Sequence, residues 1–351
     1  MLPIAFGHGK SGISFHGITS MVKSLGLLET LILLVLCLPY IAFSFEPKPH
    51  ACLDWGFFGH KKINELAIYT LPPELFGFYK YNMNYLIDHS VDPDKRRYSV
   101  KGEAECHFLD VDRYVTSTSS SPFENLPERW NDAVSKYGED SLRAHGIVPW
   151  NLYLVYSKLV IAFKEKDVNR VLRLSAEIGH YVGDVHVPLH STSNYNGQKT
   201  NQKGIHGFWE SRVPEIQFPQ YDFFVGQAEY ISAPQHFIWE RLKESYAAVD
   251  SVLKFEAQLT EQFPSDKKYA FEVRNNIEVR TYSREFSEAY SKLLNGQIER
   301  RMRSAVYSLG SLWLSAWADA GQPNLKDWYL KEEEITDEPT EHETKKIREH
   351  E

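Results

Sequence analysis

The stretch VNRVLRLSAEIGHYVGDVH, residues 168–186, is strongly apolar on one helical face and ends just before Pro188. This periodicity predicts a buried amphipathic helix, and the proline favours its end at that point. Its last turns are unusual, because GHYVGDVHVPLH (179–190) places three histidines and one aspartate within twelve positions. His180 and Asp184 are four residues apart, so a helix brings both onto one face. We therefore expect a helix that carries polar side chains into an apolar interior.

A second pair with the same spacing lies in GIHGFWES, where His206 precedes Glu210 by four residues. Two ligands spaced in this way can bind one ion from adjacent helical turns. A single such pair is weak evidence, because a lone histidine on an apolar face is more often a hydrogen-bonded core residue. Two pairs with His190 between them are harder to explain by packing. An unpaired buried charge is costly, so Asp184 on its apolar helix favours a cation as partner.

Most of the remaining chain has helical periodicity, and few segments alternate as strands do. The sequence therefore predicts an all-α, single-domain helical bundle over residues 45–328. The segments expected to contain its other helices are 60–71, 72–91, 129–146, 148–167, 205–215, 224–258, 267–275 and 282–320.

The N-terminal 44 residues resemble a targeting segment. Lys23 precedes the apolar run LILLVLCLPYIAF (31–43), and the small residues Ala42 and Ser44 lie near its end. This pattern is typical of a cleaved leader over residues 1–44, with Met21 as a candidate start. The alternative is an uncleaved leader that anchors the chain, although the run is short for a span of about 20 residues. We expect export to a periplasmic or secreted location, with no transmembrane span in the mature chain.

The formal net charge is −8, and it is unevenly distributed. Residues 331–351 carry nine acidic and four basic side chains and contain no aromatic residue. We therefore expect a charged, flexible tail over residues 329–351. The charge gives no sign of a basic stripe for nucleic acid. It does not exclude a nucleic-acid substrate, because bound metal cations supply local positive charge.

Two of the three cysteines lie outside the predicted leader. Cys52 shortly precedes the motif WGFFGH (55–60), and Cys106 is next to His107. An exported protein permits disulfides, so a Cys52–Cys106 bridge is a candidate if these two segments meet. The alternative is two separate free thiols.

Four ordered motifs resemble the superfamily of zinc-dependent phospholipase C and the single-strand-specific zinc nucleases. Each motif is modest by itself, but the four occur in the same order along residues 55–210. They are WGFFGH (55–60), the pair Asp92 and His107 fifteen residues apart, GHYVGDVHVPLH (179–190) and GIHGFWE (204–210).

The resemblance implies an α-helical fold around three zinc ions with nitrogen and oxygen ligands. The first zinc would be held by Asp92, His107, His180 and Asp184. The second would be held by His190, His206 and Glu210. The third would be held by Trp55, His60 and the second carboxylate oxygen of Asp184.

Two positions in this ligand set stay open. Asp94 competes with Asp92, and the fifteen-residue gap to His107 favours Asp92. In the family, the tryptophan is the first residue of the mature enzyme, whereas ten residues separate Trp55 from the predicted leader. Either a second processing step frees Trp55, or its carbonyl alone binds zinc, or the third metal is weak.

The resemblance also implies a reaction, in which water activated by zinc attacks a phosphodiester. Asp92 or Asp184 would orient that water. Arg96, in the basic run after Asp92, is a candidate phosphate clamp, and the alternative is a solvated basic turn.

The substrate class is left open by conflicting observations. Glu210 and the lack of net positive charge favour a phospholipase C-like enzyme, whereas the five-residue step from Trp55 to His60 resembles the nucleases. The partner is therefore a phosphodiester, either phospholipid or single-stranded nucleic acid, and no stable protein partner is implied. The alternative from another class is a non-catalytic zinc-binding envelope protein.

Overall fold

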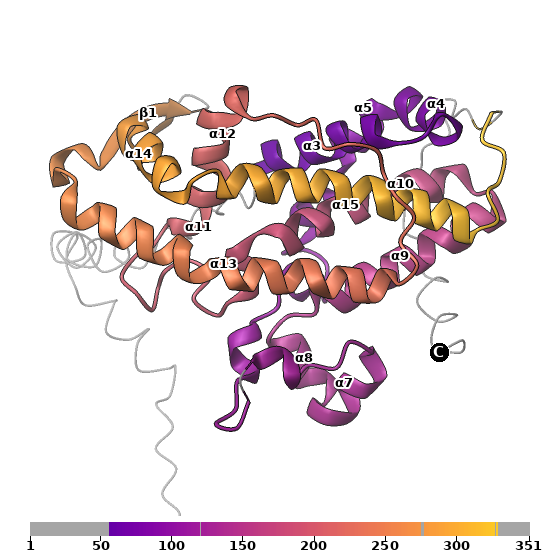
Figure 1. Ribbon diagram of the computed structural model, residues 1–351, viewed down its shortest axis with the longest axis horizontal. Helices are drawn as coiled ribbons and strands as arrows, with labels where there is room; N and C mark the ends of the chain where they lie inside the picture. Colours follow the sequence, from indigo (N-terminus) through magenta and orange to yellow (C-terminus); the bar gives the residue numbers. More distant parts are fainter. Residues whose placement is uncertain (1–55, 120, 275–276, 327, 329–351) are drawn as a thin grey trace, which may run out of the picture. The chain divides into compact units, whose positions relative to one another are not determined.

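Helices α9 (Val148–Glu165) and α10 (Val168–His186) are consecutive and pack against each other (Figure 1). Lys166 ends α9 in the left-handed conformation, with φ of 59°. Asp167 caps α10, because its side chain accepts a hydrogen bond from the Arg170 amide, a favoured capping arrangement. The helix predicted over residues 168–186 is confirmed.

The computed structural model describes residues 56–119, 121–274, 277–326 and 328. These residues all belong to one compact unit, Leu53–Glu351. The predicted leader with Met21, Cys52, Trp55 and nearly all of the predicted tail lie outside the described residues.

Other helices surround α10 in an α-helical bundle, so the expected all-α fold is confirmed. Those that pack directly on α10 include α3 (Gly56–Ala67), α5 (Met83–His89), α13 (Pro234–Gln262) and α15 (Gln297–Asp319). The other α-helices among the described residues are α4 (Pro73–Tyr81), α6 (Asp92–Arg96), α7 (Trp130–Tyr137), α8 (Glu139–Ala144), α11 (Ile205–Gly207), α12 (Val213–Gln217) and α14 (Arg284–Leu294).

Aromatic side chains fill the interior between α4, α10 and α15. The rings of Tyr79 and Trp313 stack with centroids 4.6 Å apart. Both side chains also hydrogen-bond to Ser175 of α10, the tyrosine hydroxyl at 2.9 Å and the indole N–H at 3.1 Å. Buried aromatic groups with satisfied polar atoms fix the orientation of neighbouring helices, so α10 is held firmly on this side.

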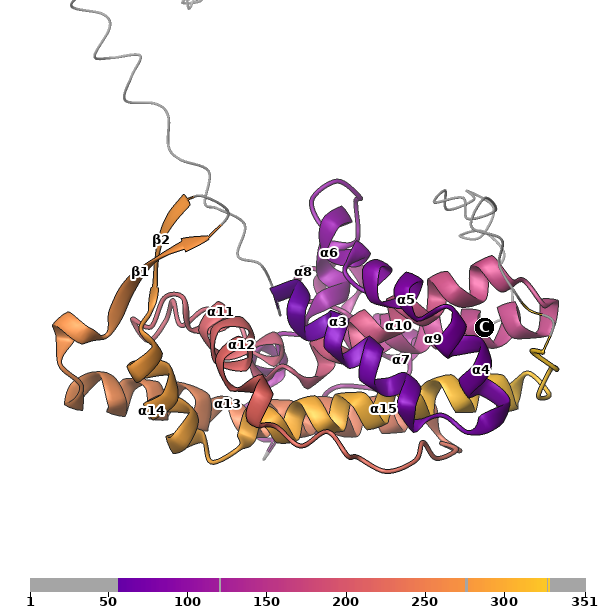
Figure 2. The same ribbon diagram turned by 90° about the horizontal axis from the view of Figure 1, so that it is seen from above.

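The helix expected over residues 267–275 is wrong. Strand β1 (Tyr269–Arg274) pairs there with β2 (Ile277–Tyr282) in an antiparallel hairpin. The sequence YAFEVR alternates large apolar side chains with others, and aromatic and β-branched residues favour strands. The hairpin stands out from the helices in Figure 2.

The expected helix boundaries over 224–258 and 129–146 also need correction. Residues 224–233 are extended, and α13 begins at Pro234. Gly138, with φ of 79°, separates α7 from α8. Within the part of the chain that the structure describes, none of the helices has the length and apolar character that a bilayer span requires.

Candidate metal centre

Helix α10 carries His180 and Asp184 into the interior, where both side chains are fully buried. His180 Nε2 lies 3.3 Å from Asp184 Oδ2. His180 Nδ1 donates a hydrogen bond to the Ser90 carbonyl at 2.9 Å. Since a carbonyl only accepts, the proton of the neutral ring is on Nδ1, and the Nε2 lone pair faces the carboxylate.

Two glycines let α3 approach α10 closely enough to add His60 to this cluster. A Cβ at Gly183 would lie 2.7 Å from His60 Nδ1, and one at Gly179 would lie 2.2 Å from the Asn64 side chain. The His60 ring therefore stacks on His180, with centroids 4.0 Å apart. His60 Nε2 lies 3.7 Å from Asp184 Oδ1.

His107 and Asp94 complete the first group of side chains. His107, at the end of the 3₁₀ turn η3 (Ala104–His107), places Nδ1 3.1 Å from Asp184 Oδ2 and 3.0 Å from His180 Nε2. Asp94 Oδ1 lies 3.6 Å from His107 Nδ1 and 3.5 Å from His180 Nε2. Both Asp94 carboxylate oxygens are buried and accept no hydrogen bond from the described residues.

The structure corrects the choice between the two aspartates of α6. Asp92 points away from the cluster, because His89 Nδ1 and Lys95 Nζ bind its carboxylate at 2.5 and 2.7 Å. Residues two apart on a helix point about 200° apart, so only one of Asp92 and Asp94 can face the histidines. The fifteen-residue spacing pointed to Asp92, and the geometry selects Asp94.

A second group joins His190, His206 and Glu210. His206 Nε2 lies 3.1 Å from His190 Nε2 and 3.0 Å from Glu210 Oε2. His190 Nδ1 donates to the His107 carbonyl at 2.6 Å, and His206 Nδ1 donates to the Tyr195 carbonyl at 3.1 Å. Three lone-pair acceptors therefore meet at one point.

The backbone around this second group is irregular. His190 lies in the 3₁₀ turn η6 (Pro188–Ser191), which follows directly after the end of α10. Glu210 lies in a π-helical segment, η7 (Phe208–Arg212), between α11 and α12. Single π-helical turns are rare and frequent at functional sites. The expected 205–215 helix is thus present in three short parts.

Burial and mutual charge shift the pKa values of these groups in opposite directions. Burial opposes ionisation of Asp184, but its interactions with the surrounding histidines, His180 and His190 above all, outweigh it and hold its carboxyl pKa well below the usual value. Burial raises the pKa of the Asp94 carboxyl despite nearby His180. Burial lowers the pKa of His60 well below its usual value. Two buried carboxylates therefore share one site, which a divalent cation would stabilise.

Arg96 does not point into the cluster as a phosphate clamp. Its guanidinium donates to Glu103 at 2.7 Å and to Glu177 at 3.0 Å. Glu103 also accepts from the Tyr181 hydroxyl at 2.5 Å and lies 3.5 Å from His107 Nε2. Arg96 therefore orients His107 through Glu103, in the way that partners of metal-binding histidines do.

Sequence reasoning missed Glu103, although it precedes His107 by four residues, the same spacing as the two recognised pairs. Burial lowers the pKa of His206, but the charge and hydrogen bond of Glu210 outweigh it, so that this pKa is raised; the nearby charge of Arg97 acts on His206 as a smaller, lowering effect. His186 is buried on the opposite side of α10, where Nε2 lies 3.2 Å from Ser304 Oγ.

The expected disulfide finds no support in the described residues. Cys106 is a free, partly buried thiol that donates to the Gly102 carbonyl at 3.1 Å. Burial raises the pKa of this thiol to about 12. Cys52 and the expected ligand Trp55 lie outside the described residues, so the pairing stays a prediction.

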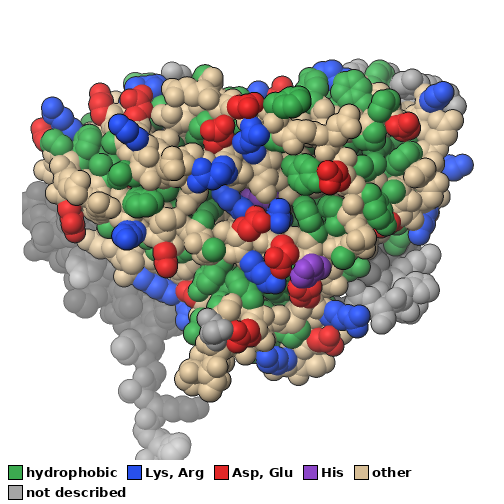
Figure 3. Space-filling model, viewed as in Figure 1, with side chains coloured by type: hydrophobic (Ala, Val, Ile, Leu, Met, Phe, Trp, Pro, Cys, Tyr) green, Lys and Arg blue, Asp and Glu red, His purple; other side chains and the backbone are tan. Residues whose placement is uncertain are grey.

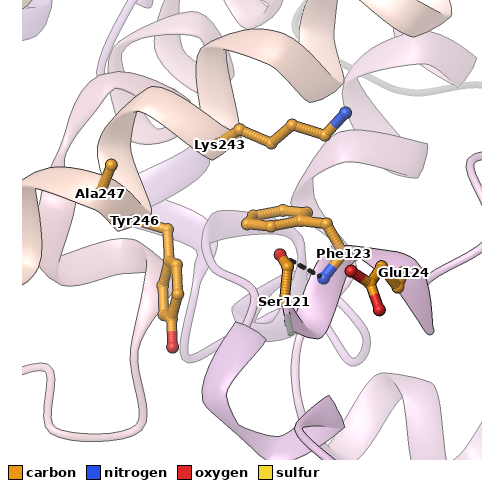
Figure 4. A pocket seen from close by; sticks show the side chains of 6 residues that line it. All are labelled: Ser121, Phe123, Glu124, Lys243, Tyr246 and Ala247. Atoms are coloured by element: carbon orange, nitrogen blue, oxygen red, sulfur yellow. Dashed lines mark hydrogen bonds between the residues drawn. The ribbon is translucent and has the colours of Figure 1, made fainter. Parts of the chain in front are cut away.

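A separate hollow lies between α13 and the 3₁₀ turn η5 (Pro122–Glu124) (Figure 4). Its lining residues are Ser121, Phe123, Glu124, Lys243, Tyr246 and Ala247. None of them belongs to the histidine and carboxylate groups, so the hollow is distinct from the candidate site.

The donor set fits zinc. Three sets of ligand atoms lie within 4.8 Å of one another: His60, Asp94 and His180; His107, His180 and Asp184; and His190, His206 and Glu210. Zinc accepts imidazole nitrogen and carboxylate oxygen. In a metal site, each histidine typically directs the lone pair of one ring nitrogen at the ion and donates a hydrogen bond from the other nitrogen.

Comparison with known proteins agrees with this geometry. A family model described as zinc dependent phospholipase C matches residues 59–273. That range contains His60 and every other described ligand candidate. A search of the curated proteins found no match. Since the matched range covers more than half of the chain, this protein belongs to the zinc-dependent phospholipase C family.

Proposed function

We propose that this protein is a zinc-dependent phosphodiesterase that cleaves phospholipid in the manner of a phospholipase C. The observation that carries the proposal is the meeting of His190 Nε2, His206 Nε2 and Glu210 Oε2 within 3.5 Å of one another. Without a cation, three acceptors at this distance repel one another. Membership of the family supports the same chemistry.

The geometry supports an assignment of ligands to ions. One zinc would be held by Asp94, His107, His180 and Asp184, and a second by His190, His206 and Glu210. His60 and Asp184 Oδ1 would contribute to a third, with Trp55 as the expected further ligand. His190 Nδ1 lies 3.5 Å from Asp184 Oδ1, so this aspartate lies between the groups.

When bound, zinc lowers the pKa of a coordinated water and polarises phosphoryl oxygens. The side chains of the protein would orient the water and the phosphodiester. Four histidines lie within 3.7 Å of the Asp184 carboxylate, so its oxygens are positioned to accept a proton from a water or to bridge two ligand groups. The side chains of Asp94 and His206 are 8% and 7% exposed, whereas those of His107 and Asp184 are fully buried. A phosphodiester therefore approaches beside Asp94 and His206, where the positive charge of Arg97 acts.

Two assays test the proposal. Hydrolysis of bis-p-nitrophenyl phosphate should be abolished by a chelator and restored by zinc. Parallel assays on phosphatidylcholine vesicles and single-stranded DNA should show preferential release of the phosphorylated headgroup. A zinc-loaded protein without activity on any of the three substrates would favour a non-catalytic zinc-binding protein.

Single-strand nuclease activity is the second candidate, and one observation favours it. Tyr195 is 54% exposed, and its ring lies 6.1 Å from that of His206. An exposed aromatic ring beside the site is a platform on which a nucleobase could stack. Faster cleavage of single-stranded DNA than of lipid in the parallel assays would select this alternative.

A further inference from the structure

The β1–β2 hairpin exposes large apolar side chains to solvent. Phe271 is 69% and Val273 is 74% exposed, and both lie on the same face of β1. Single exposed apolar residues are ordinary, but clustered ones mark interaction surfaces.

The hairpin is attached to the segment that carries Glu210. Arg212, two residues after Glu210, donates to the Glu272 carboxylate at 2.9 Å and to the Tyr282 carbonyl at 3.1 Å. Phe208 stacks on Tyr282, with centroids 3.8 Å apart. The hairpin base is therefore fixed to η7, and its position relative to Glu210 is defined.

A second exposed apolar pair lies on the other side of the site. Tyr98 and Val100 follow α6, which carries Asp94, and they are 79% and 49% exposed. Figure 2 shows that α6 with its following loop and the β1–β2 hairpin project from the same side of the helical body. Between them lie α11, which carries His206, and the start of α3. The two apolar projections thus flank the metal centre.

Basic residues flank Tyr98 and Val100 in the sequence, although Lys95 pairs with Asp92 and Arg96 pairs with Glu103 and Glu177. The segment KRRYSVK (95–101) contains four basic residues and no acidic one, although the chain carries a net charge of −8. Apolar side chains among basic ones are typical of segments that insert at an anionic lipid surface. By contrast, the face over α13 and α15 in Figure 3 intersperses basic and acidic side chains.

We propose that Phe271 and Val273 of the hairpin, together with Tyr98 and Val100, form a docking surface for a phospholipid bilayer containing anionic lipid. This inference rests on the proposed lipid substrate and assigns the surface that brings it to the site. Two of the four side chains are aliphatic and have no flat ring for base stacking, so the surface favours lipid over nucleic acid. Aromatic side chains with a polar end suit the interface.

The experiment measures co-sedimentation of the full chain with vesicles of phosphatidylcholine and phosphatidylserine, in the presence of a chelator so that no lipid is cleaved. Two double variants, F271S/V273S and Y98S/V100S, are compared with F224S. Phe224 is 85% exposed and lies in the segment after α12, where Arg303 of α15 donates to its carbonyl at 3.0 Å. It is a matched control for loss of an exposed aromatic side chain.

We expect each double variant to bind vesicles at least about tenfold more weakly, because buried apolar contact is lost. F224S should bind like the wild type, and all variants should hydrolyse bis-p-nitrophenyl phosphate at the wild-type rate with zinc. Equal vesicle binding by wild type and double variants would overturn the docking surface. Binding of oligothymidylate in place of vesicles, or self-association lost in the double variants, would also overturn it. Inactivity of the wild type on the soluble ester would count against the proposed function alone.

Discussion

At the scale of single residues, the assignment of Asp94 in place of Asp92 as a zinc ligand can be tested by single substitutions. We expect D94N to lower zinc affinity and phosphodiesterase activity by at least about 100-fold. Substituting a residue that only supports a metal ligand usually lowers affinity or activity by about 10- to 100-fold, and loss of a ligand itself should cost more. D92N should retain zinc and activity, since its carboxylate binds His89 and Lys95. Zinc content by elemental analysis checks both variants. Loss of zinc in D92N with retention in D94N would reverse the assignment.

Glu103 gives a prediction about pH. Burial opposes its ionisation, but hydrogen bonds from His107 and Arg96 lower its pKa from 4.5 to about 2. A carboxyl with a lowered folded-state pKa stabilises the protein above the unfolded value, and this stability is lost as pH falls from 4.5 towards 2. The contribution is on the order of 3 kcal/mol.

We therefore expect the free energy of unfolding of E103Q to fall less steeply than that of the wild type over this acid range. Urea denaturation at a series of pH values measures the slope. E105Q is the control, because the neighbouring Glu105 contacts Arg143 at 3.4 Å, outside the metal cluster. Parallel curves for wild type and E103Q would show that Glu103 is not held ionised by His107 and Arg96.

At the scale of secondary structure, the close approach of α3 and α10 depends on Gly183. A Cβ there would lie 2.7 Å from His60 Nδ1, so we expect G183A to displace His60 and to destabilise the fold by about 1–3 kcal/mol. Gly77 in α4 has no atom within 4 Å of the corresponding position. G77A should therefore be neutral or slightly stabilising, as alanine favours helix. Denaturation midpoints and zinc content measure the effect, and equal values for G183A and wild type would contradict it.

The sequence predicted the elements in which apolar residues recur with a regular helical period. Helix α10 was expected over the residues where it is found, because its apolar face and Pro188 define it. The β1–β2 hairpin was missed, since an alternating run of only six residues is too short to separate strand from helix by periodicity. The four-residue spacing was sufficient to pair His180 with Asp184, and His206 with Glu210. The choice of Asp94 and the roles of Glu103 and Arg96 depend on contacts between α6, η3 and α10 that no local pattern reports.

At the scale of the whole molecule, bound zinc should stabilise the fold. Asp94 and Asp184 bring two carboxylates into one buried site, so a cation that binds only the folded chain raises stability by about 4 kcal/mol at about 1,000 times its Kd. We expect a chelator to lower the Tm by about 10 °C. Differential scanning calorimetry with and without chelator measures this shift, and readdition of zinc should restore the Tm. A Tm that does not respond to the chelator would show that the cluster binds no structural metal.

The most direct measurement of the central claim is anomalous X-ray diffraction at the zinc edge from crystals of the zinc-loaded protein. The account predicts one peak about 2.0–2.2 Å from the ligand atoms of His190, His206 and Glu210, and another at the same distances from those of Asp94, His107, His180 and Asp184. Anomalous peaks confined to exposed groups such as His236, with none between these side chains, would contradict it.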